Sequence, residues 1–480
     1  MKWCMCANKA RTMFLSATAA MGLAASAVAG STEPTKVLFF FDTEDFIQPR
    51  SADAIRDIAN ILASEGVKGH FATVGYLGKK LVDWRRVDVL DALKPHHVGT
   101  QTLYHSLHPN VTEHTDIEDY DSAYVRAMDE ESRGIGMLMA GTGKEKMWCS
   151  VLPGNGNTIV AMYLYADLGI PFFGGGCGMY DDRTHCGDIW YCNQRHLTYA
   201  YSLTLESFLP GATVGDIDAK LSELATHQVV TFYMHPHMAV CTEHWDEPAF
   251  KRGNLHPFGE WPYAKARNPA DTAVFYERLR AFVRRLKADP RFEFTDCPAL
   301  HAAENRRMAI TAAEIPAVRA ALLKELAPVR APAEWSVADC FLAAVRLLRG
   351  EKRHEPGKVY GFLYAPEGVK EKVRVKKTDL VEAAKRMDIS RFLPHAIDCG
   401  GVKIGPADFL FAALEVLETG ADEVDVEPRE QLGDIAKYLP KMAVAKFKGT
   451  WIYTPEYKDE WTAKRLRWQF WTFRYERPSR

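Results

Sequence analysis

The chain has 480 residues, of which 47% are hydrophobic and 25% are charged, and its formal net charge is −2. This length predicts two or three domains, and the balanced charge argues against nucleic acid or an anionic membrane as the main partner. Residues 1–29 have the pattern of a signal peptide, with three basic residues before the apolar run Met13–Val28 and an Ala-x-Ala site that ends at Ala29. We therefore expect a secreted, periplasmic or cell-envelope protein without a transmembrane segment after cleavage; an uncleaved anchor is the alternative.

Short apolar runs alternate with helical patterns from residue 36 onward. Lys36–Phe41 and Gly69–Gly75 have the composition of buried strands, and apolar residues recur at helical spacing between them. Strands that alternate with helices predict a parallel sheet. We expect an α/β domain over residues 30–305 that forms a closed or nearly closed barrel, with an open doubly wound sheet as the alternative. In both folds, functional residues follow the carboxyl ends of the strands.

The composition changes after this domain. Residues 306–335 are predicted to form a helix and a linker, and residues 336–480 a small, mostly helical module. Two segments of that module, Ala338–Ala344 and Ala407–Ala413, share the pattern Ala-Asp-x-x-x-Ala-Ala on amphipathic helices. The repeat predicts a tandem duplication; chance similarity between Ala-rich helices is the alternative.

Candidate catalytic residues follow three of the predicted strands. The first strand leads into Asp42-Thr43-Glu44-Asp45, where one carboxylate can bind a divalent cation while another acts as a general base. The third strand is followed by His105 and His108, at a spacing typical of metal ligands. For the acidic segment the alternative is a solvated loop, and for the histidine pair it is two surface histidines near a turn.

A late strand over Val229–Met234 leads into His235-Pro236-His237. If the strand continues, its period of two places both histidines on one face. A histidine at a strand end can serve as a general acid or as a ligand, and a polar strand terminus is the alternative.

Taken together, the order and spacing of these motifs resemble the polysaccharide deacetylase (NodB-homology) family, over roughly residues 36–300. The resemblance implies a distorted (β/α) barrel and a divalent metal, usually zinc, that hydrolyses N- or O-acetyl groups on sugars. By this resemblance Asp42 would be the general base and His235 the general acid, with Asp45 or Glu44 as a metal ligand.

The chain departs from the family pattern at two motifs. Gln101 stands where the first of two ligand histidines is expected and His105 where the second is, so we expect His108 to complete a ligand set with Asp45 and His105. Val151 stands where the Arg of an Arg-x-Pro motif is expected. Either the site is a rearranged metal-dependent deacetylase, or the protein binds glycan without turnover. The residues expected to contact substrate are Glu44, Pro153, Asn155 and His237.

The expected partner is a carbohydrate polymer or oligosaccharide. Three short segments, Phe392–Pro394, Gly400–Ile404 and Ala407–Phe409, faintly resemble pseudomurein-binding repeats. This resemblance implies cell-wall attachment through the C-terminal module. Hydrolysis of a small cyclic amide by a related barrel is a third functional class. An oxidising compartment permits a disulfide among Cys177, Cys186 and Cys192, which lie close together in the sequence.

Overall fold

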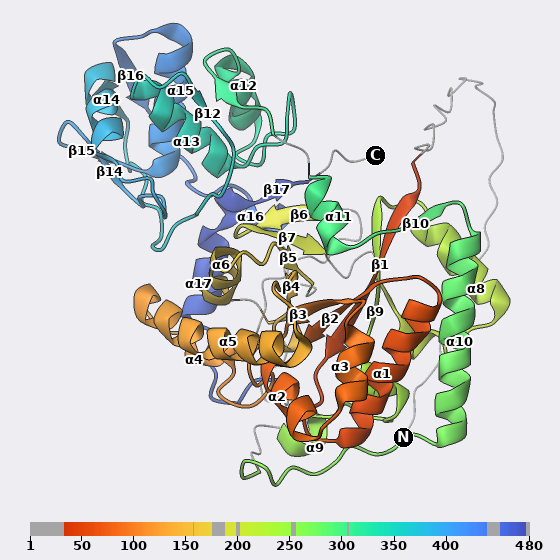
Figure 1. Ribbon diagram of the computed structural model, residues 1–480. Coiled ribbons are helices and arrows are strands. Elements are labelled where there is room, and N and C mark those ends of the chain that lie inside the picture. Colours follow the sequence, from red (N-terminus) through yellow and green to blue (C-terminus); the bar gives the residue numbers. More distant parts are fainter. Residues whose placement is uncertain are drawn as a thin grey trace, which may run out of the picture. The chain divides into compact units, whose positions relative to one another are not determined.

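Figure 1 shows a computed structural model of the chain, which describes residues 33–156, 158–174, 188–197, 202–250, 256–304, 307–438 and 452–476. The predicted signal peptide lies outside these ranges, and so do Cys177 and Cys186. The described residues from Glu33 onward belong to one compact unit. No helix in these ranges combines the length and the apolar character needed to cross a bilayer.

The main sheet contains 11 strands within the described residues, in the order β17-β6-β7-β5-β4-β3-β2-β1-β9-β8, with β10 also paired to β1. All neighbouring pairs between β8 and β7 are parallel, and so is β1–β10, whereas β6 and β17 pair antiparallel at one edge. The predicted α/β class, with a parallel sheet of the distorted-barrel type, is confirmed. The strands are β1 (Thr35–Thr43), β2 (Gly69–Thr73), β3 (His97–Thr100), β4 (Cys149–Ser150), β5 (Phe172–Phe173), β6 (Asp188–Tyr191), β7 (Gln194–Leu197), β8 (Ser202–Thr204), β9 (Val229–Met234), β10 (Phe292–Phe294) and β17 (Arg474–Tyr475).

Helices connect the parallel strands, as Figure 1 shows for α1, α3 and α10 beside β1. Helix α1 buries the apolar residues that recur along one side, because Ile55, Ile58 and Leu62 fall on one face of a 3.6-residue period. The helices of this part are α1 (Pro49–Ser64), α2 (Gly75–Asp83), α3 (Val87–Leu93), α4 (Val111–His114), α5 (Tyr120–Thr142), α6 (Ile159–Asp167), α7 (Leu205–Phe208), α8 (Val214–Leu224), α9 (Glu247–Phe250), α10 (Pro269–Ala288) and α11 (Cys297–Ala302).

Strand β1 is central to the sheet and determines where the site forms. Val37–Phe41 is fully buried, as expected for a strand covered on both faces. Its carboxyl end is level with the ends of its neighbours: Thr43 pairs with Thr73, and Phe41 with Met234. The segments that follow β1, β2, β3 and β9 therefore emerge at one edge of the sheet, called the carboxyl edge below.

Helix α5 supports the segment that follows β3. The Glu131 carboxyl group on α5 is fully buried and accepts hydrogen bonds from the Leu103 backbone N–H (3.2 Å) and the Tyr165 hydroxyl (2.5 Å). Burial, with a smaller contribution from Glu130, raises the pKa of Glu131 to about 8. The backbone just after Gln101 is thus held by a buried acid that is protonated at neutral pH.

We expect Glu131→Gln to remove a pH dependence of stability. Because the folded chain raises this pKa above its usual value, the native state binds the extra proton, and wild-type stability falls as pH rises through about 8. A glutamine carries no charge; its oxygen can accept from the Leu103 N–H, and its NH2 group can donate to the Tyr165 hydroxyl. Thermal melts at pH 6 and pH 9 should show the variant more stable than wild type at pH 9 by at least about 1 kcal/mol. An equal loss of stability in both proteins between the two pH values would contradict this assignment.

The C-terminal part contains helices α12 to α17 and, within the described residues, three small two-stranded antiparallel sheets. Its two Ala-Asp segments open helices α13 and α15, where Asp339 and Asp408 accept hydrogen bonds from the backbone N–H of Ser336 and Gly405. Both segments therefore begin a helix in the same way. The elements are β11 (Ile310–Thr311), α12 (Ile315–Lys324), α13 (Val337–Leu348), β12 (Arg353–His354), β13 (Val373–Lys376), α14 (Lys377–Arg386), β14 (Ile397–Cys399), β15 (Val402–Ile404), α15 (Pro406–Thr419), β16 (Glu423–Val426), α16 (Ile435–Tyr438) and α17 (Trp461–Trp468).

Side chains on both sides of the predicted boundary at residue 305 share one core. Helix α6 belongs to the same buried cluster as α13, α15 and the segment Phe470–Phe473. Strand β17 extends the barrel sheet by pairing with β6. The domain limits remain a prediction, and the contacts show that the C-terminal end of the chain packs back onto the barrel.

Candidate active site

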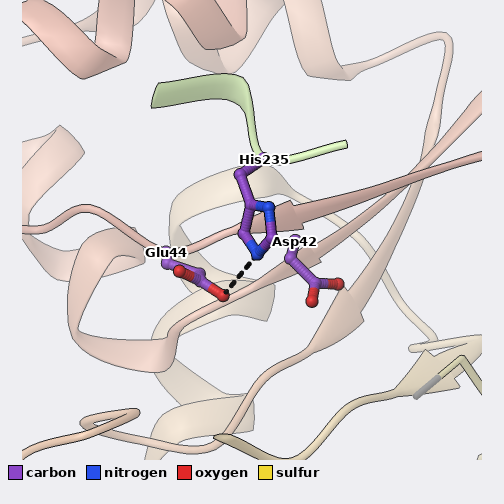
Figure 2. A group of neighbouring side chains, drawn as sticks. All are labelled: Asp42, Glu44 and His235. Atoms are coloured by element: carbon purple, nitrogen blue, oxygen red, sulfur yellow. Dashed lines mark ion pairs between the residues drawn. The ribbon is translucent and has the colours of Figure 1, made fainter. Parts of the chain in front are cut away.

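Three side chains with metal-ligating or acid–base groups converge at the carboxyl edge. Asp42, Glu44 and His235 each place one such atom within 4.8 Å of the others, and they form the one group of this kind among the described residues. Asp42 and Glu44 come from the end of β1, and His235 follows β9, so their proximity results from the parallel pairing of the two strands. Figure 2 shows the His235 ring above the two carboxylates, 3.6 Å from Glu44 Oε1.

Glu44 receives hydrogen bonds from the segment after β3 and from the loop after β9. Gln101 Nε2 donates to Glu44 Oε1 and Trp245 Nε1 donates to Glu44 Oε2, both at 2.7 Å. His105 Nε2 lies 3.2 Å from Glu44 Oε1. Burial alone would raise the pKa of Glu44, but the charges of His105 and His235 hold it well below its usual value. Glu44 is thus ionised, and the two motif positions Gln101 and His105 both bind it.

The His105 ring lies between two carboxylates. Its Nε2 faces Glu44, and its Nδ1 donates to Ser106 Oγ at 2.9 Å, which in turn donates to Asp246. Burial alone would lower the pKa of His105, but Glu44 and Asp246 raise it to about 10. Asp246 is not among the predicted site residues. It lies in the loop after β9, and its position beside His105 depends on how that loop folds.

A series of hydrogen bonds joins Asp42 to His235. The Tyr233 hydroxyl donates to Asp42 Oδ2 (2.6 Å) and accepts from His235 Nε2 (2.8 Å), and His235 Nδ1 donates to Glu206 Oε1 (2.8 Å). Burial raises the pKa of Asp42 to about 7. Burial would lower the pKa of His235, but Glu44 and Glu206 raise it to about 9. A buried acid and base connected in this way are typical of general acid–base sites.

The sequence motifs do not identify Tyr233 or Glu206. One signal for Tyr233 is its position two residues before His235, which places both on one face of the strand. Glu206 lies in the first turn of helix α7, which follows β8, and β8 pairs with β9. It therefore becomes recognisable only when the order of the strands is known.

Two further histidines lie beside His235. The ring centroids of His235, His237 and His244 are 4.9–5.6 Å apart. His237, predicted to contact substrate, is 2% exposed, and neither of its ring nitrogens has a hydrogen-bond partner among the described residues. Burial holds the pKa of His237 well below its usual value, so the ring is neutral. His237 thus borders the site with two unused ring nitrogens.

Asp45 has a role in the local backbone. Its Oδ1 accepts hydrogen bonds from the backbone N–H groups of Ile47 (2.8 Å) and Gln48 (3.0 Å), and its Oδ2 accepts from the side chains of Gln48 and Ser51. These four donors fix the turn between β1 and α1. Burial raises the pKa of Asp45 to about 6. The carboxylate is directed into this turn, and Asp45, His105 and His108 do not converge as a ligand set.

His108 has partners on a different surface. Its Nδ1 lies 2.7 Å from Glu113 Oε2, and Glu113 in turn accepts from the Thr454 backbone N–H. With these residues and Tyr457, His108 lines a cavity of about 460 Å³ against the C-terminal segment. The i, i+3 spacing does not by itself place His108 on the same side as His105, because His105 has a φ of 52° and the chain after it is not helical.

The remaining predicted residues follow β4. Pro153 is buried in a short 3-10 helix, Pro153–Asn155, which packs against Ile452 through Gly154. The side chain of Asn155 lies outside the described part of the chain. Val151, at the position of the expected arginine, is buried among Leu38, Phe40 and Cys149, so this position contributes an apolar contact to the core.

Two buried oxygen atoms bear on whether the site can bind a cation. Asp42 Oδ1 and Gln101 Oε1 accept no hydrogen bond from any described residue, and such acceptors cost free energy unless a donor or a cation compensates them. The 3.2 Å between His105 Nε2 and Glu44 Oε1 is a separation that two ligands of one ion adopt when each bond is about 2 Å long. Carboxylate, amide and imidazole groups together suit a divalent cation. Glu44 and His105 are therefore close enough to bind one such ion, and Gln101 lies next to Glu44.

No protein-family model matches the sequence, and no curated protein matches it. Solved structures that resemble the chain include a putative polysaccharide deacetylase from Mycobacterium smegmatis, with 15% identity and a TM-score of 0.36 over 57% of this chain and 91% of that one. A CE4 family pseudoenzyme from Bacillus anthracis is 12% identical, with a TM-score of 0.33 over 56% and 66%. A 4-alpha-glucanotransferase from Thermococcus litoralis is 10% identical, with a TM-score of 0.37 over 55% and 39%. The chain spans less than two thirds of the length of the last two. Since all three TM-scores lie below 0.5, the geometry of the site alone supports the function proposed below.

Proposed function

We propose that the chain hydrolyses acetyl groups on an extracellular or cell-wall glycan at the carboxyl edge of the sheet, with a divalent cation, zinc being the expected ion. The observation that carries this proposal is the hydrogen-bonded series from Glu206 through His235 and Tyr233 to Asp42. It places an acid and a base side by side, next to a carboxylate, Glu44, that can hold a cation. Burying so many ionisable groups together opposes folding, which favours a functional reason for the cluster.

Asp42 and His235 have complementary parts in this reaction. Asp42 Oδ1 accepts no hydrogen bond from the described residues and can take a proton from an attacking water molecule. His235, oriented by Glu206, delivers a proton to the nitrogen or oxygen atom that leaves the acetyl carbon. Tyr233 bonds to both groups and holds them in place.

A cation fits beside these groups, at the three positions of the ligand motif. Glu44, Gln101 through its carbonyl oxygen, and His105 through Nε2 would hold it. It would supply Lewis-acid polarisation of the acetyl carbonyl. The predicted set of Asp45, His105 and His108 is thereby replaced by Glu44, Gln101 and His105.

Asp42→Asn should remove the base and lower acetate release from an acetylated oligosaccharide by about 10²–10⁴-fold. The amide keeps the size of the side chain, and its oxygen can still accept from Tyr233. Asp45→Asn is the matched control, because Asp45 is also buried at the end of β1 but is directed into the turn. This control should lower the melting temperature and leave the rate of the folded enzyme within a fewfold of wild type. Full activity of Asp42→Asn would contradict the assignment, as would inactivity of a folded Asp45→Asn.

A second candidate function is glycan binding without turnover. The specific observation in its favour is that Gln101, Trp245 and His105 already direct N–H groups at Glu44. These donors compete with a cation for the same carboxylate. Acetate release by the purified wild-type protein separates the two functions, because only the first produces it, and it should depend on added zinc.

Export and attachment complete the proposal. The N-terminal pattern of basic and apolar residues supports export, and the C-terminal module, with its paired Ala-Asp helices, is the part proposed to attach the protein to a cell wall. Both parts of the proposal rest on the sequence pattern.

A further inference from the structure

Three aromatic side chains meet at the carboxyl edge, outside the group of ionisable residues. Tyr76 lies in the first turn of α2, after β2; Tyr104 follows β3; and Phe258 lies in the long connection after β9. Their ring centroids are 5.4 Å (Tyr76–Tyr104), 5.6 Å (Tyr76–Phe258) and 6.3 Å (Tyr104–Phe258) apart. We refer to Tyr76, Tyr104 and Phe258 as the aromatic surface.

Phe258 is displayed to solvent by a tight turn. The Glu260 backbone N–H donates to the Pro257 carbonyl oxygen (2.9 Å), and Gly259 has a φ of +89°. These are the features of a type II turn with glycine at its third position. The Phe258 side chain remains 58% exposed, with Trp261 packed behind it at 4.8 Å. Phe258 therefore presents an apolar ring at the surface while it packs against Tyr76, Tyr104 and Trp261.

Packed aromatic rings connect this surface to the ionisable group. Behind Phe258, Trp261 contacts Phe46 (5.5 Å), and Phe46 contacts Trp245 (4.8 Å). Trp245 donates a hydrogen bond to Glu44. The exposed rings are therefore held by the same packing that positions a residue of the candidate active site, and they lie at the same edge of the sheet.

We propose that the aromatic surface binds pyranose rings of a glycan chain that extends from the candidate active site. This inference rests on the proposed function and specifies its substrate as a polymer or long oligosaccharide. A pyranose ring presents apolar C–H groups on its faces and hydroxyl groups at its rim. Aromatic faces pack against the C–H groups, and the hydroxyls of Tyr76 and Tyr104 can bond to the rim. The surface thus matches the amphipathic form of a sugar chain.

The test compares Phe258→Ala with Tyr263→Ala in the full chain. Tyr263 is 56% exposed in the same connection, and among the described ring pairs it stacks on no other ring, so its variant is a matched control. Calorimetric titration with an N-acetylglucosamine hexamer and with the monomer measures affinity without requiring turnover. We expect Phe258→Ala to weaken hexamer binding by about fivefold to tenfold and Tyr263→Ala to leave it unchanged. Monomer binding should be the same in all three proteins.

The outcomes separate this inference from the proposed hydrolysis. Weaker hexamer binding by Phe258→Ala supports the aromatic surface even if wild type releases no acetate. Equal hexamer affinity in wild type and Phe258→Ala overturns it even if both release acetate. A wild-type protein that binds the hexamer no more tightly than the monomer overturns it as well.

Discussion

Gln101→His is expected to convert the site into a much stronger metal site. Gln101 is buried, and its side chain reaches Glu44 directly, so a histidine there would stand beside both Glu44 and His105. Imidazole is a far better zinc ligand than a neutral amide. Structural zinc sites gain about 10–16 kcal/mol from four ligands, so one added ligand should tighten zinc binding on the order of 100-fold.

The measurement is a zinc titration of both proteins against a competing chelator, followed by acetate release with zinc bound. Gln101→Ala is the control, because it removes the hydrogen bond to Glu44 without adding a ligand. The double variant Gln101→His/His105→Ala should lose the gain. If Gln101→His binds zinc no more tightly than wild type, Gln101 does not occupy the ligand position and the motif alignment is incorrect.

The central part of the site could be predicted because it depends on strand order alone. Asp42 and Glu44 follow β1, His105 follows β3 and His235 follows β9, and parallel strands bring their carboxyl ends to one edge. The apolar runs that mark β1 and β9 are clear in the sequence, whereas β3 is the short segment His97–Thr100, with Val98 as its one large apolar residue. Placing the site required the strand assignment and no knowledge of the loops.

The part of the predicted ligand set that the described residues do not bring together depends on local backbone that the spacing does not reveal. The spacing of His105 and His108 indicates a shared face only if the residues between them are helical, and the left-handed φ of His105 breaks that relation. The sequence is also compatible with a structural role for Asp45, because an aspartate shortly before a helix often accepts hydrogen bonds from backbone N–H groups two and three residues later. Four donors in that turn leave it no part in the group around Glu44.

A fragment that ends at residue 304 is expected not to fold, although the change in composition near residue 305 predicts a domain boundary there. The eight consecutive residues Ile159–Ala166 of α6 are all buried, which requires neighbours on every side. Several of these neighbours come from beyond residue 305. Tyr163 stacks on Tyr360 (4.9 Å between ring centroids) and donates to Gln469 Oε1 (2.6 Å).

Strand β6, which pairs with β17, also depends on residues beyond position 305. Tyr191, on β6, donates a hydrogen bond to the Leu466 carbonyl oxygen, and the Cys192 backbone N–H donates to Thr472. The fully buried Trp471 belongs to the same core cluster as α6. Each large apolar side chain exposed by truncation costs about 1.5–3 kcal/mol, so about five of them are comparable with the roughly 5–15 kcal/mol that stabilises a typical domain.

Expression of residues 30–304 and of residues 30–480 provides the comparison. We expect the long chain to be soluble with a cooperative thermal transition, and the short one to be aggregated or to lack near-UV circular dichroism. Co-expression of residues 30–304 with residues 307–480 should restore a soluble complex, because the two pieces share their core. A monodisperse short fragment with a cooperative transition would show that α6 is stable without its C-terminal neighbours. In that case the boundary predicted from composition would also be a boundary of folding.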